Sequence, residues 1–375
     1  MKFNSIRIND IKCIVWYVPL ELNHSSYILS STLLFAKQNN IEFKISNKNL
    51  NKRGQINVLN DKVRYTDHWF SKVTYVDFIL HSNKKIRLAF DLNDLGYYFS
   101  RHAFKIADVV YKRSYNPKFI NRLATSKKSK IKKMGLPFMV RPNESPEPLK
   151  LCFNYLIFRF KQYVKPNRSV FSRGIKIFPL VYKELKRFFY TRKVSDFEVV
   201  SLNLNNNIFY QKRLFYSKDV DVKNLTEQRV NMIQILKNSF GDVFKGGLME
   251  DSLSVKLYPE IISNISGDQH AFLEEMKNCG ICIYTRGLKK STGWTLSEFM
   301  SQGKCIIAEQ IYNDLPFKIR HDVEVMFYNS DEEMIEFCKQ LVLDENKRKE
   351  LGENARKYYD RYVNPKTFLE SLLKN

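Results

Sequence analysis

The chain has 375 residues, of which 44% are hydrophobic and 14% aromatic, and its 62 lysines and arginines outnumber its 39 acidic residues to give a net charge of +23. This hydrophobic content excludes disorder as the main state, and the length exceeds what one hydrophobic core usually supports, so we expect two domains. The charge indicates acidic partners, which could be nucleic acid, an anionic membrane surface or phosphate-bearing substrates.

No apolar run is long enough to span a bilayer, and the stretch from Met1 to Asp10 lacks the apolar core of a signal peptide, so we expect a cytoplasmic protein. The 6 cysteines are scattered along the chain. Cys279 and Cys282 have metal-ligand spacing, but no second pair of cysteines or histidines follows at the distance of a zinc site. The sequence therefore predicts reduced, buried cysteines and no bound metal.

Short apolar runs that alternate with polar loops predict an α/β domain in the N-terminal part of the chain. Strands are expected at Ile11–Val18, Ile41–Ile45, Val73–Leu80, Ile86–Phe90, Asp108–Tyr111 and Phe138–Val140, with a helix that ends near Gln38. His24 lies in the loop between the first strand and this helix, at the carboxyl end of a strand. Ligands bind at such ends in α/β sheets, although a lone loop histidine is more often simply solvated.

Two carboxylates, Asp91 and Asp94, follow the strand that ends at Phe90. A carboxylate at a strand end could act as a base, or as a hydrogen-bond acceptor for a sugar hydroxyl, and Asp94 is the candidate for this role. The alternative is an aspartate that caps the helix expected to follow.

Residues 149–193 carry many basic residues, interleaved aromatic residues and a single acid, Glu184. This composition suits an interfacial membrane segment or a single-stranded nucleic-acid surface, and it also occurs in partly buried elements between domains. Because no RRM, KH or zinc-knuckle signature accompanies the segment, the membrane interpretation ranks above nucleic acid. The candidate docking residues are Lys183, Lys186 and Arg187.

The C-terminal half also alternates strands with helices. Strands are expected at Asn207–Arg213, Val243–Phe244, Ile281–Thr285, Lys304–Ala308 and Val325–Tyr328, and Gly246 and Gly247 are expected to form a turn at a strand end. Helices are expected at Leu225–Phe240, Trp294–Ser301, Asp331–Val342, Asp344–Tyr359 and Pro365–Leu373.

The stretch from Ile281 to Ala308 is the most informative of these. It predicts a strand, a polar loop, a helix and a second parallel strand, with Gly303 at the end of the helix. The loop opens onto a helix N-terminus, whose N–H groups suit a phosphate, and Glu298 follows one turn later, where its carboxylate can accept hydrogen bonds from two ribose hydroxyls. The alternative is an ordinary strand–helix–strand unit with a solvated basic loop.

This stretch resembles the nucleotide-sugar site of glycosyltransferase family 4, the group 1 transferases of the GT-B fold. The family signature is Glu-x7-Glu followed by a small residue, Gly and an apolar strand, and Gly293, Trp294, Thr295, Glu298 and Gly303 match it. The first glutamate is replaced by Lys290, at the position that lies near the transferred sugar in the family. Upstream, Arg213, Leu214 and Lys218 resemble the family's Arg-x4-Lys, which clamps the donor diphosphate.

The resemblance implies an α/β chain of the GT-B fold, with two Rossmann-like domains facing a cleft. The expected division is an acceptor domain at residues 1–148, a basic aromatic connecting segment at 149–193, a donor domain at 194–355, and terminal helices at 356–375 that could cross back to the first domain. In GT-B enzymes the loop that contains His24 faces the acceptor, so His24, Asp94 and Lys290 are the candidate catalytic residues. The implied donor-binding residues are Arg213, Lys218, Gly293, Trp294, Thr295 and Glu298.

The function that the resemblance implies is sugar transfer from a nucleotide-diphosphate sugar to a saccharide or lipid-linked saccharide, as in capsule, lipopolysaccharide or O-antigen synthesis. It implies retention of anomeric configuration and needs no metal or other cofactor, because the diphosphate charge would be stabilised by basic residues and a helix start. Such a protein would lie at the inner face of the cytoplasmic membrane and bind no nucleic acid. The alternative is a basic RNA- or polyphosphate-binding protein on a degenerate transferase fold.

Overall fold

The computed structural model describes residues 7–60, 62–143, 148–163, 170–200 and 205–374. It divides into two units: unit 1 comprises Met1–Ser195, Asn313–Pro316 and Tyr362–Asn375, and unit 2 comprises Asp196–Tyr312 and Phe317–Arg361. Each unit has its own sheet and its own buried apolar cluster. The expected α/β class with two domains is confirmed.

The main sheet of unit 1 has six strands in the order β2-β1-β5-β6-β8-β9. The strands are β1 (Ile11–Tyr17), β2 (Glu42–Ser46), β5 (Val73–Leu80), β6 (Lys85–Asp91), β8 (Val109–Lys112) and β9 (Ile131–Lys133). All run parallel except β5, which is antiparallel to both β1 and β6. Consequently the start of β5 lies at the same edge as the carboxyl ends of the other strands.

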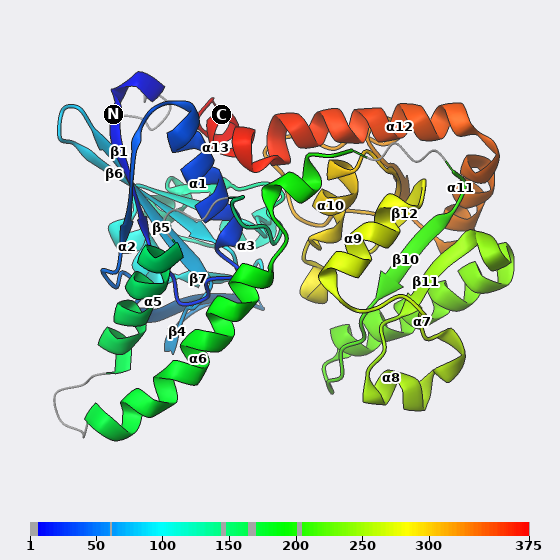
Figure 1. Cartoon of the computed structure of the whole chain (residues 1–375), viewed down its shortest axis with the longest axis horizontal. Coiled ribbons are helices and arrows are strands. Elements are labelled where there is room, and N and C mark those ends of the chain that lie inside the picture. Colours follow the sequence, from blue (N-terminus) through cyan, green and yellow to red (C-terminus); the bar gives the residue numbers. More distant parts are fainter. Residues whose placement is uncertain (1–6, 61, 144–147, 164–169, 201–204, 375) are drawn as a thin grey trace. The chain divides into compact units, whose positions relative to one another are not determined.

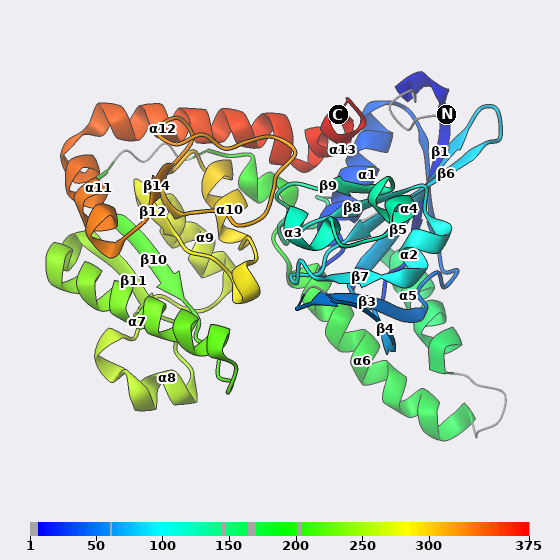
Figure 2. The same ribbon diagram turned by 180° about the vertical axis from the view of Figure 1, so that it is seen from behind.

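A second sheet of unit 1, shown from behind in Figure 2, was not expected from the sequence. It contains β3 (Arg53–Leu59), β4 (Lys62–Trp69) and β7 (Tyr98–Ser100) in the order β4-β3-β7. β4 is mostly exposed and polar, so it lacks the continuous apolar run that marks a buried strand. The strand expected at Phe138–Val140 is wrong, because these residues form no strand and the sheet ends at β9.

Unit 1 also contains helices, which lie around its main sheet (Figure 1). They are α1 (Ser26–Gln38), α2 (Arg101–Ile106), α3 (Pro117–Ile120), α4 (Thr125–Lys128), α5 (Pro148–Tyr163), α6 (Val170–Tyr190) and α13 (Pro365–Lys374). The C-terminal helix α13 packs on α1, where the rings of Tyr27 and Phe368 lie 4.9 Å apart. α5 and α6 lie side by side as a helical pair in Figure 1.

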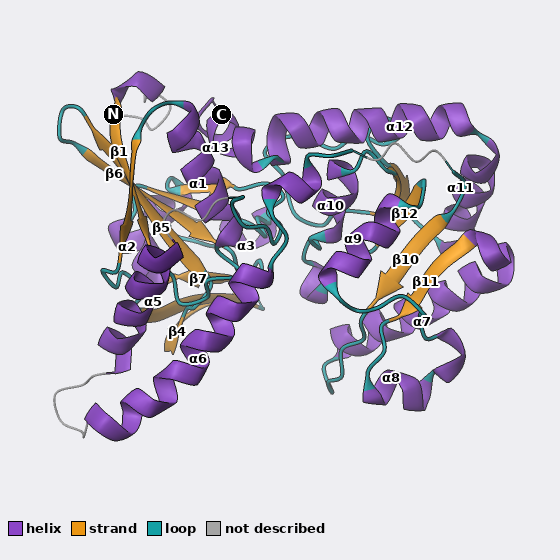
Figure 3. Ribbon diagram, in the orientation of Figure 1, coloured by secondary structure: helices purple, strands orange, loops and turns teal. Residues whose placement is uncertain are grey.

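Unit 2 is built on a five-stranded, fully parallel sheet with the order β11-β10-β12-β13-β14. The strands are β10 (Ile208–Lys212), β11 (Phe244–Leu248), β12 (Ile281–Tyr284), β13 (Cys305–Glu309) and β14 (Met326–Tyr328). Its helices, coloured purple in Figure 3, are α7 (Val220–Phe240), α8 (Ser252–Leu257), α9 (Gln269–Lys277), α10 (Thr295–Ser301), α11 (Asp331–Leu343) and α12 (Glu345–Tyr358).

Alternate residues of β10 pack on opposite layers of helices. Ile208 joins the cluster that includes residues of α7 and α11, whereas the ring of Phe209 lies 5.1 Å from that of Phe272 on α9 and 6.4 Å from that of Phe299 on α10. Both faces of the sheet are therefore covered, which explains why its strands are continuous apolar runs.

The turn expected at Gly246 and Gly247 is wrong, because both residues lie inside β11. Their φ angles are +130° and +131°, which side-chain-bearing residues rarely adopt. A Cβ added to Gly246 would lie 2.2 Å from the carbonyl oxygen of Tyr210 on β10. Gly246 thus allows close approach of β10, and Gly247 allows close approach of the backbone at Ile261 and Ser263.

The observed units differ from the sequence-based division. The helices of residues 149–193, α5 and α6, belong to unit 1, and residues 164–169 of that segment lie outside the described part of the chain. Residues 362–375 also belong to unit 1, as does the short stretch Asn313–Pro316.

The contact between Gly352 on α12 and Gly303, which follows α10, gives a test of the fold. A Cβ at Gly352 would lie 2.2 Å from the Gly303 carbonyl oxygen. In an exposed helix, Gly→Ala normally stabilises by about 1 kcal/mol. Here we expect Gly352→Ala to destabilise the protein by about 2 kcal/mol, because the backbone must move.

Scanning calorimetry of the full chain measures this change. Asn346→Ala, at an exposed position of the same helix, is the matched control and should be neutral or slightly stabilising. Equal melting temperatures for the wild type and Gly352→Ala would contradict the packing described.

Candidate functional site

The carboxyl edge of the unit 2 sheet gathers most of the residues expected from the sequence. Because all strands are parallel, the residues that follow β10, β12 and β13 lie at one edge. Arg213 follows β10, the loop from Thr285 to Trp294 follows β12, and Glu309 ends β13. The expected strand–loop–helix–strand order of this stretch is confirmed.

A lysine and a glutamate are buried at this edge. Lys212, the last residue of β10, is 8% exposed, and Glu298 on α10 is 3% exposed. The two interact electrostatically. Burial and the nearby Arg229 lower the pKa of Lys212 to about 7, against the raising effect of Glu298 and Glu309.

The basic residues Arg213 and Lys218 are both exposed. The guanidinium of Arg213 lies 5.6 Å from the centre of the Phe215 ring. The backbone carbonyl of Arg213 accepts a hydrogen bond from the buried Arg229 of α7. The backbone at the end of β10 is thereby held while the Arg213 side chain remains at the surface.

The loop after β12 is held by carboxylates on both sides. The backbone N–H of Arg286 donates to Oε2 of Glu309 at 2.9 Å, and its guanidinium donates to Oδ1 of Asp221 at 2.9 Å. Asp221 also accepts from the N–H of Lys289 at 2.7 Å, and the Lys289 amine lies 2.6 Å from Asp219. Since Asp219 is adjacent to Lys218, these bonds bring the two basic stretches together.

Lys289 and Lys290 both have left-handed backbone conformations, with φ of 54° and 61°. Such conformations cost energy for residues with side chains and are kept where surrounding contacts enforce them. The amine of Lys290 lies 4.5 Å from the centre of the Tyr312 ring, within the range of a cation–π contact. The residue in place of the family's first glutamate thus has a defined position.

The residues at the start of α10 are less available to a phosphate than the motif implies. The N–H of Gly293 donates to the Tyr284 hydroxyl at 2.9 Å, so it is engaged within the protein. Gly293, Trp294 and Thr295 are all half-buried, and α10 is only 7 residues long. The basic residues therefore carry most of the positive charge at this edge.

Several residues at this edge were missed by the sequence analysis. Lys212 was read only as part of a strand, and Asp221, Arg286 and Glu309 received no role. The sequence feature that could have pointed to Lys212 and Glu309 is a charged residue at the end of an apolar run. A charge buried at a strand end requires partners.

In unit 1, His24 lies with charged residues from several strand ends. Its Nδ1 is 2.9 Å from Oε2 of Glu21, which also accepts from the Ser71 hydroxyl. Burial acts to raise the pKa of Glu21, but the bonds from His24 and Ser71 lower it overall. The contact of Nδ1 with the Glu21 carboxylate fixes the orientation of the imidazole ring.

Asp94 lies beside His24 and is held by two cations. Its Oδ2 is 2.7 Å from the Lys72 amine, and its Oδ1 is 2.6 Å from the Arg113 guanidinium. Burial acts to raise the pKa of Asp94, but Arg113 and Lys72 hold it below the ordinary value, with a contribution from His24. The helix-capping alternative is wrong, because Ser100 caps the next helix, α2.

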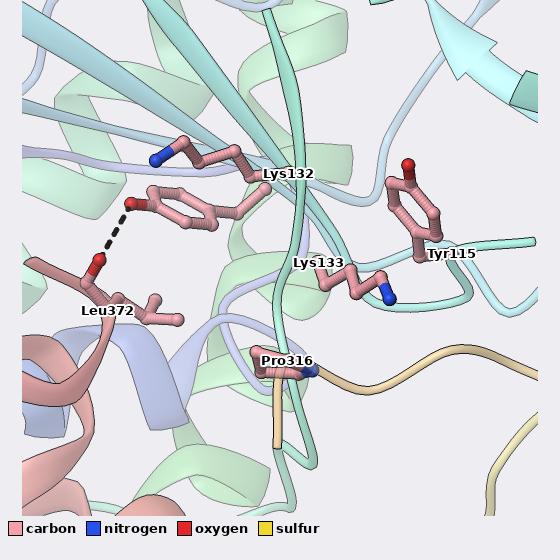
Figure 4. Close-up of a pocket in the computed structure, with 6 residues that line it drawn as sticks. Tyr115, Lys132, Lys133, Pro316 and Leu372 are labelled. Atoms are coloured by element: carbon pink, nitrogen blue, oxygen red, sulfur yellow. Dashed lines mark hydrogen bonds between the residues drawn. The ribbon is translucent and has the colours of Figure 1, made fainter. Parts of the chain in front are cut away.

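A cavity of about 320 Å³ opens where β8 and β9 end. Its lining residues are Tyr111, Tyr115, Lys132, Lys133, Pro316 and Leu372. Figure 4 shows the side chains of Lys132 and Lys133 pointing in different directions. The Tyr111 hydroxyl donates a hydrogen bond of 3.5 Å to the Leu372 carbonyl. Burial lowers the pKa of Lys132, and Lys133 pairs with Asp314 at 3.0 Å. The cavity therefore combines cations with aromatic rings.

The exposed face of α6 carries apolar residues followed by basic ones. Phe178 and Tyr182 are 58% and 67% exposed, and Lys183, Lys186 and Arg187 are exposed in the next turns. None of the described helices has both the length and the apolar character needed to cross a bilayer. Within the described ranges, no group of three or more His, Cys, Asp or Glu side chains has the arrangement of a metal site.

No protein-family model and no curated protein matches the chain. Among solved structures, HepE from Anabaena in complex with UDP is similar at 11% identity and a TM-score of 0.39, over 72% of this chain and 64% of that one. A glycosyltransferase from Rickettsia africae is similar at 14% identity and a TM-score of 0.38, over 74% and 66% of the two chains. TarM is similar at 12% identity and a TM-score of 0.32, over 86% and 79%. The chain thus spans slightly less than two thirds of the length of the first two proteins.

The contacts of Asp94 predict how its removal affects stability. Asp94→Asn should destabilise the protein by about 1–3 kcal/mol at pH 7, because Arg113 and Lys72 lose the negative charge between them and one of the two accepting oxygens. Since the folded pKa of Asp94 is lowered, its contribution is present above the unfolded pKa of about 3.9 and is lost as the pH falls through the lower folded value.

Urea unfolding at several pH values measures the difference between the two proteins. It should be largest near neutral pH and shrink below about pH 4. Asp67→Asn, at an exposed position of β4, is the control. A difference that grows on acidification would contradict the assigned ion pairs.

Proposed function

We propose that the protein is a GT-B glycosyltransferase that moves a sugar from a nucleotide-diphosphate sugar to a hydroxyl of a saccharide. The observation that carries the proposal is the cluster at the carboxyl edge of the parallel sheet of unit 2. There the cations Lys212, Arg213 and Lys218 accompany the buried carboxylate of Glu298. A diphosphate needs the cations and a ribose needs the carboxylate, and this edge is where open α/β sheets bind nucleotides.

Each residue at this edge receives a separate role. Arg213 and Lys218 hold the diphosphate through charge-assisted hydrogen bonds, and Glu298 accepts from the ribose hydroxyls. Gly293, Trp294 and Thr295 form the wall between them, at the start of α10. Lys290, fixed over Tyr312, lies beside the sugar.

The acceptor is assigned to the cluster of His24, Glu21 and Asp94 in unit 1. A hydroxyl of the acceptor forms the new bond to the anomeric carbon, its proton passes to Nε2 of His24, and the nucleoside diphosphate leaves with the electron pair of the broken bond. Asp94 orients a second sugar hydroxyl as hydrogen-bond acceptor. The nearby cavity with Lys132 and Tyr115 offers contacts for further sugars. The step needs no metal. Retention of configuration, which the motif favours, requires that the new bond form on the face of the sugar from which the diphosphate leaves.

The exposed face of α6 supports the further proposal that the enzyme acts at the inner surface of the cytoplasmic membrane. Phe178 and Tyr182 would enter the interface, and Lys183, Lys186 and Arg187 would contact anionic headgroups. A lipid-linked saccharide in the assembly of a surface polysaccharide is the acceptor that fits this location.

The donor site is tested by binding. Arg213→Ala or Lys218→Ala should weaken binding of UDP or GDP roughly tenfold while changing that of the free nucleoside much less. Glu298→Gln should cost about 1–3 kcal/mol for ribonucleotides and little for 2′,3′-modified analogues. Lys290→Ala should impair sugar transfer more than nucleotide binding.

Titration calorimetry and transfer assays measure these effects, with Lys349→Ala on the exposed face of α12 as control. Unchanged nucleotide affinity in folded Arg213→Ala and Glu298→Gln proteins would refute the placement of the site. Salt-sensitive oligonucleotide binding without any nucleotide response would favour the basic binding protein instead.

Membrane docking is tested by sedimentation with vesicles. The protein should sediment with anionic and not with neutral vesicles at low salt, since each basic residue near an anionic surface contributes about 1 kcal/mol. Conversion of Lys183, Lys186 and Arg187 to Glu should abolish most of this binding.

The matched control converts Lys339, Lys349 and Lys357, exposed on helices of unit 2, to Glu. This protein has the same net charge as the α6 variant and should still sediment. Equal loss in both variants would show that net charge alone, and not α6, determines binding.

A further inference from the structure

Lys212 is the residue at the proposed nucleotide site whose surroundings are least expected for a lysine. It ends β10, next to Arg213, and is 8% exposed. In the part of the chain that the structure describes, no oxygen accepts a hydrogen bond from its amine, which lies 5.1 Å from the centre of the Tyr210 ring. Burial of an ammonium without acceptors is costly.

Other buried lysines show how this cost is normally met. Lys112 of unit 1 donates to Asp91 and to the carbonyls of Leu95 and Tyr98, at 2.8–3.1 Å. Lys304 of unit 2 donates to the carbonyl of Lys277 at 2.8 Å. Lys304 precedes β13, so it lies at the amino edge of the sheet, opposite Lys212. Lys112 and Lys212 both end a parallel strand at a carboxyl edge, where such sheets bind ligands, but within the described residues the Lys112 amine has three oxygen acceptors and the Lys212 amine has none.

The charges around Lys212 come from every neighbouring element. They are the cation Arg229 of α7, the carboxyl groups of Glu298 on α10 and Glu309 on β13, and the thiol of Cys282 on β12. Burial is the largest influence and, with Arg229, lowers the pKa of Lys212 to about 7, whereas the glutamates and the thiol act to raise it. A dianionic diphosphate placed at this edge would add negative charge and favour the protonated amine.

We propose that the Lys212 amine contacts the diphosphate of the bound nucleotide and takes up a proton when the nucleotide binds. This inference rests on the proposed function, because it requires a nucleotide diphosphate at the edge of unit 2. It assigns to the site a residue outside the Arg-x4-Lys motif, and it makes donor affinity dependent on pH. The protonated amine gains oxygen acceptors from the ligand that the protein itself does not supply.

The test is titration of the full chain with UDP in buffers of different ionisation enthalpy, which yields the number of protons taken up. Near pH 8 the free amine is mostly neutral, so we expect close to one proton per UDP, and about half a proton near pH 7. UDP affinity should fall as the pH rises from about 7.5 to 9, a range in which the UDP phosphates are already ionised.

Variants separate this role from a structural one. Lys212→Met should lose proton uptake and weaken UDP binding tenfold or more, with a much smaller effect on uridine. Lys212→Arg should also lose proton uptake but bind UDP within a few-fold of the wild type, because a guanidinium stays protonated. Lys304→Met, the matched buried lysine at the opposite edge, should leave proton uptake unchanged.

Each outcome distinguishes the inference from the proposal on which it rests. UDP binding without proton uptake, or with the same uptake in Lys212→Met, would overturn the role of Lys212 and leave the donor site standing. Absence of binding by UDP and GDP at every pH would overturn the donor site and the role of Lys212 together. Proton uptake that persists in Lys212→Arg would assign the proton to another group and also overturn the inference.

Discussion

Burial of charge at the carboxyl edge of a parallel sheet is the constraint on which the candidate site depends. A charged side chain taken out of water must be compensated by partners, and removal of one partner costs more than the pair contributes. In unit 2 the compensation joins successive elements: Arg286 after β12 bonds with Glu309 of β13 and Asp221 of α7. Lys289 is held by the same Asp221. The loop conformation, including its left-handed lysines, therefore follows from where the carboxylates lie.

The same constraint applies in unit 1, where one charged pair is buried and a nearby carboxylate is partly exposed. Asp91 and Lys112 are both almost fully buried and bond to each other, which closes the sheet between β6 and β8. Asp94, three residues further along the chain, is more exposed. It pairs with Lys72 and Arg113 and interacts electrostatically with His24. Asp91 and Lys112 are enclosed within the sheet, although Oδ2 of Asp91 has no hydrogen-bond partner in the described part of the chain, whereas the Asp94 side chain is 33% exposed.

The sequence predicts the parts of the fold that depend on apolar pattern. The β-branched runs at residues 281–285 and 304–308 and the helix between them are found as expected, because buried parallel strands need such runs. The polar strand β4 and the short strands β7 and β9 carry no such pattern, and Phe138–Val140 is apolar without being a strand. The structural role of a glycine was also ambiguous in the sequence. Gly246 was expected in a turn, but it allows β11 to pair closely with β10.

The candidate site was predictable only in part, for a related physical reason. Motif spacing selects Glu298 and Arg213 as candidates, but spacing cannot reveal which charged residues are buried or which partners reach them from distant elements. Lys212 and Arg213 are neighbours in sequence, yet one is buried and the other exposed, because Lys212 is the last residue of the buried strand β10 and Arg213 lies just beyond it. The pairing of Asp221 with Arg286 spans 65 positions of the chain. Only the tertiary structure shows that these residues share one edge.

The positively charged side chains of the chain fall into two groups, buried and exposed. Buried cations such as Arg229 are shielded from solvent, so salt screens their interactions with neighbouring groups little. Cations such as Lys183 and Arg187 are exposed, and their field is screened over about 8 Å at physiological salt. The first kind suits selective contact with one bound phosphate group, and the second suits attraction to an extended anionic surface. The net charge of +23 therefore combines buried cations, which act on neighbouring groups, with exposed cations, whose field attracts anionic partners.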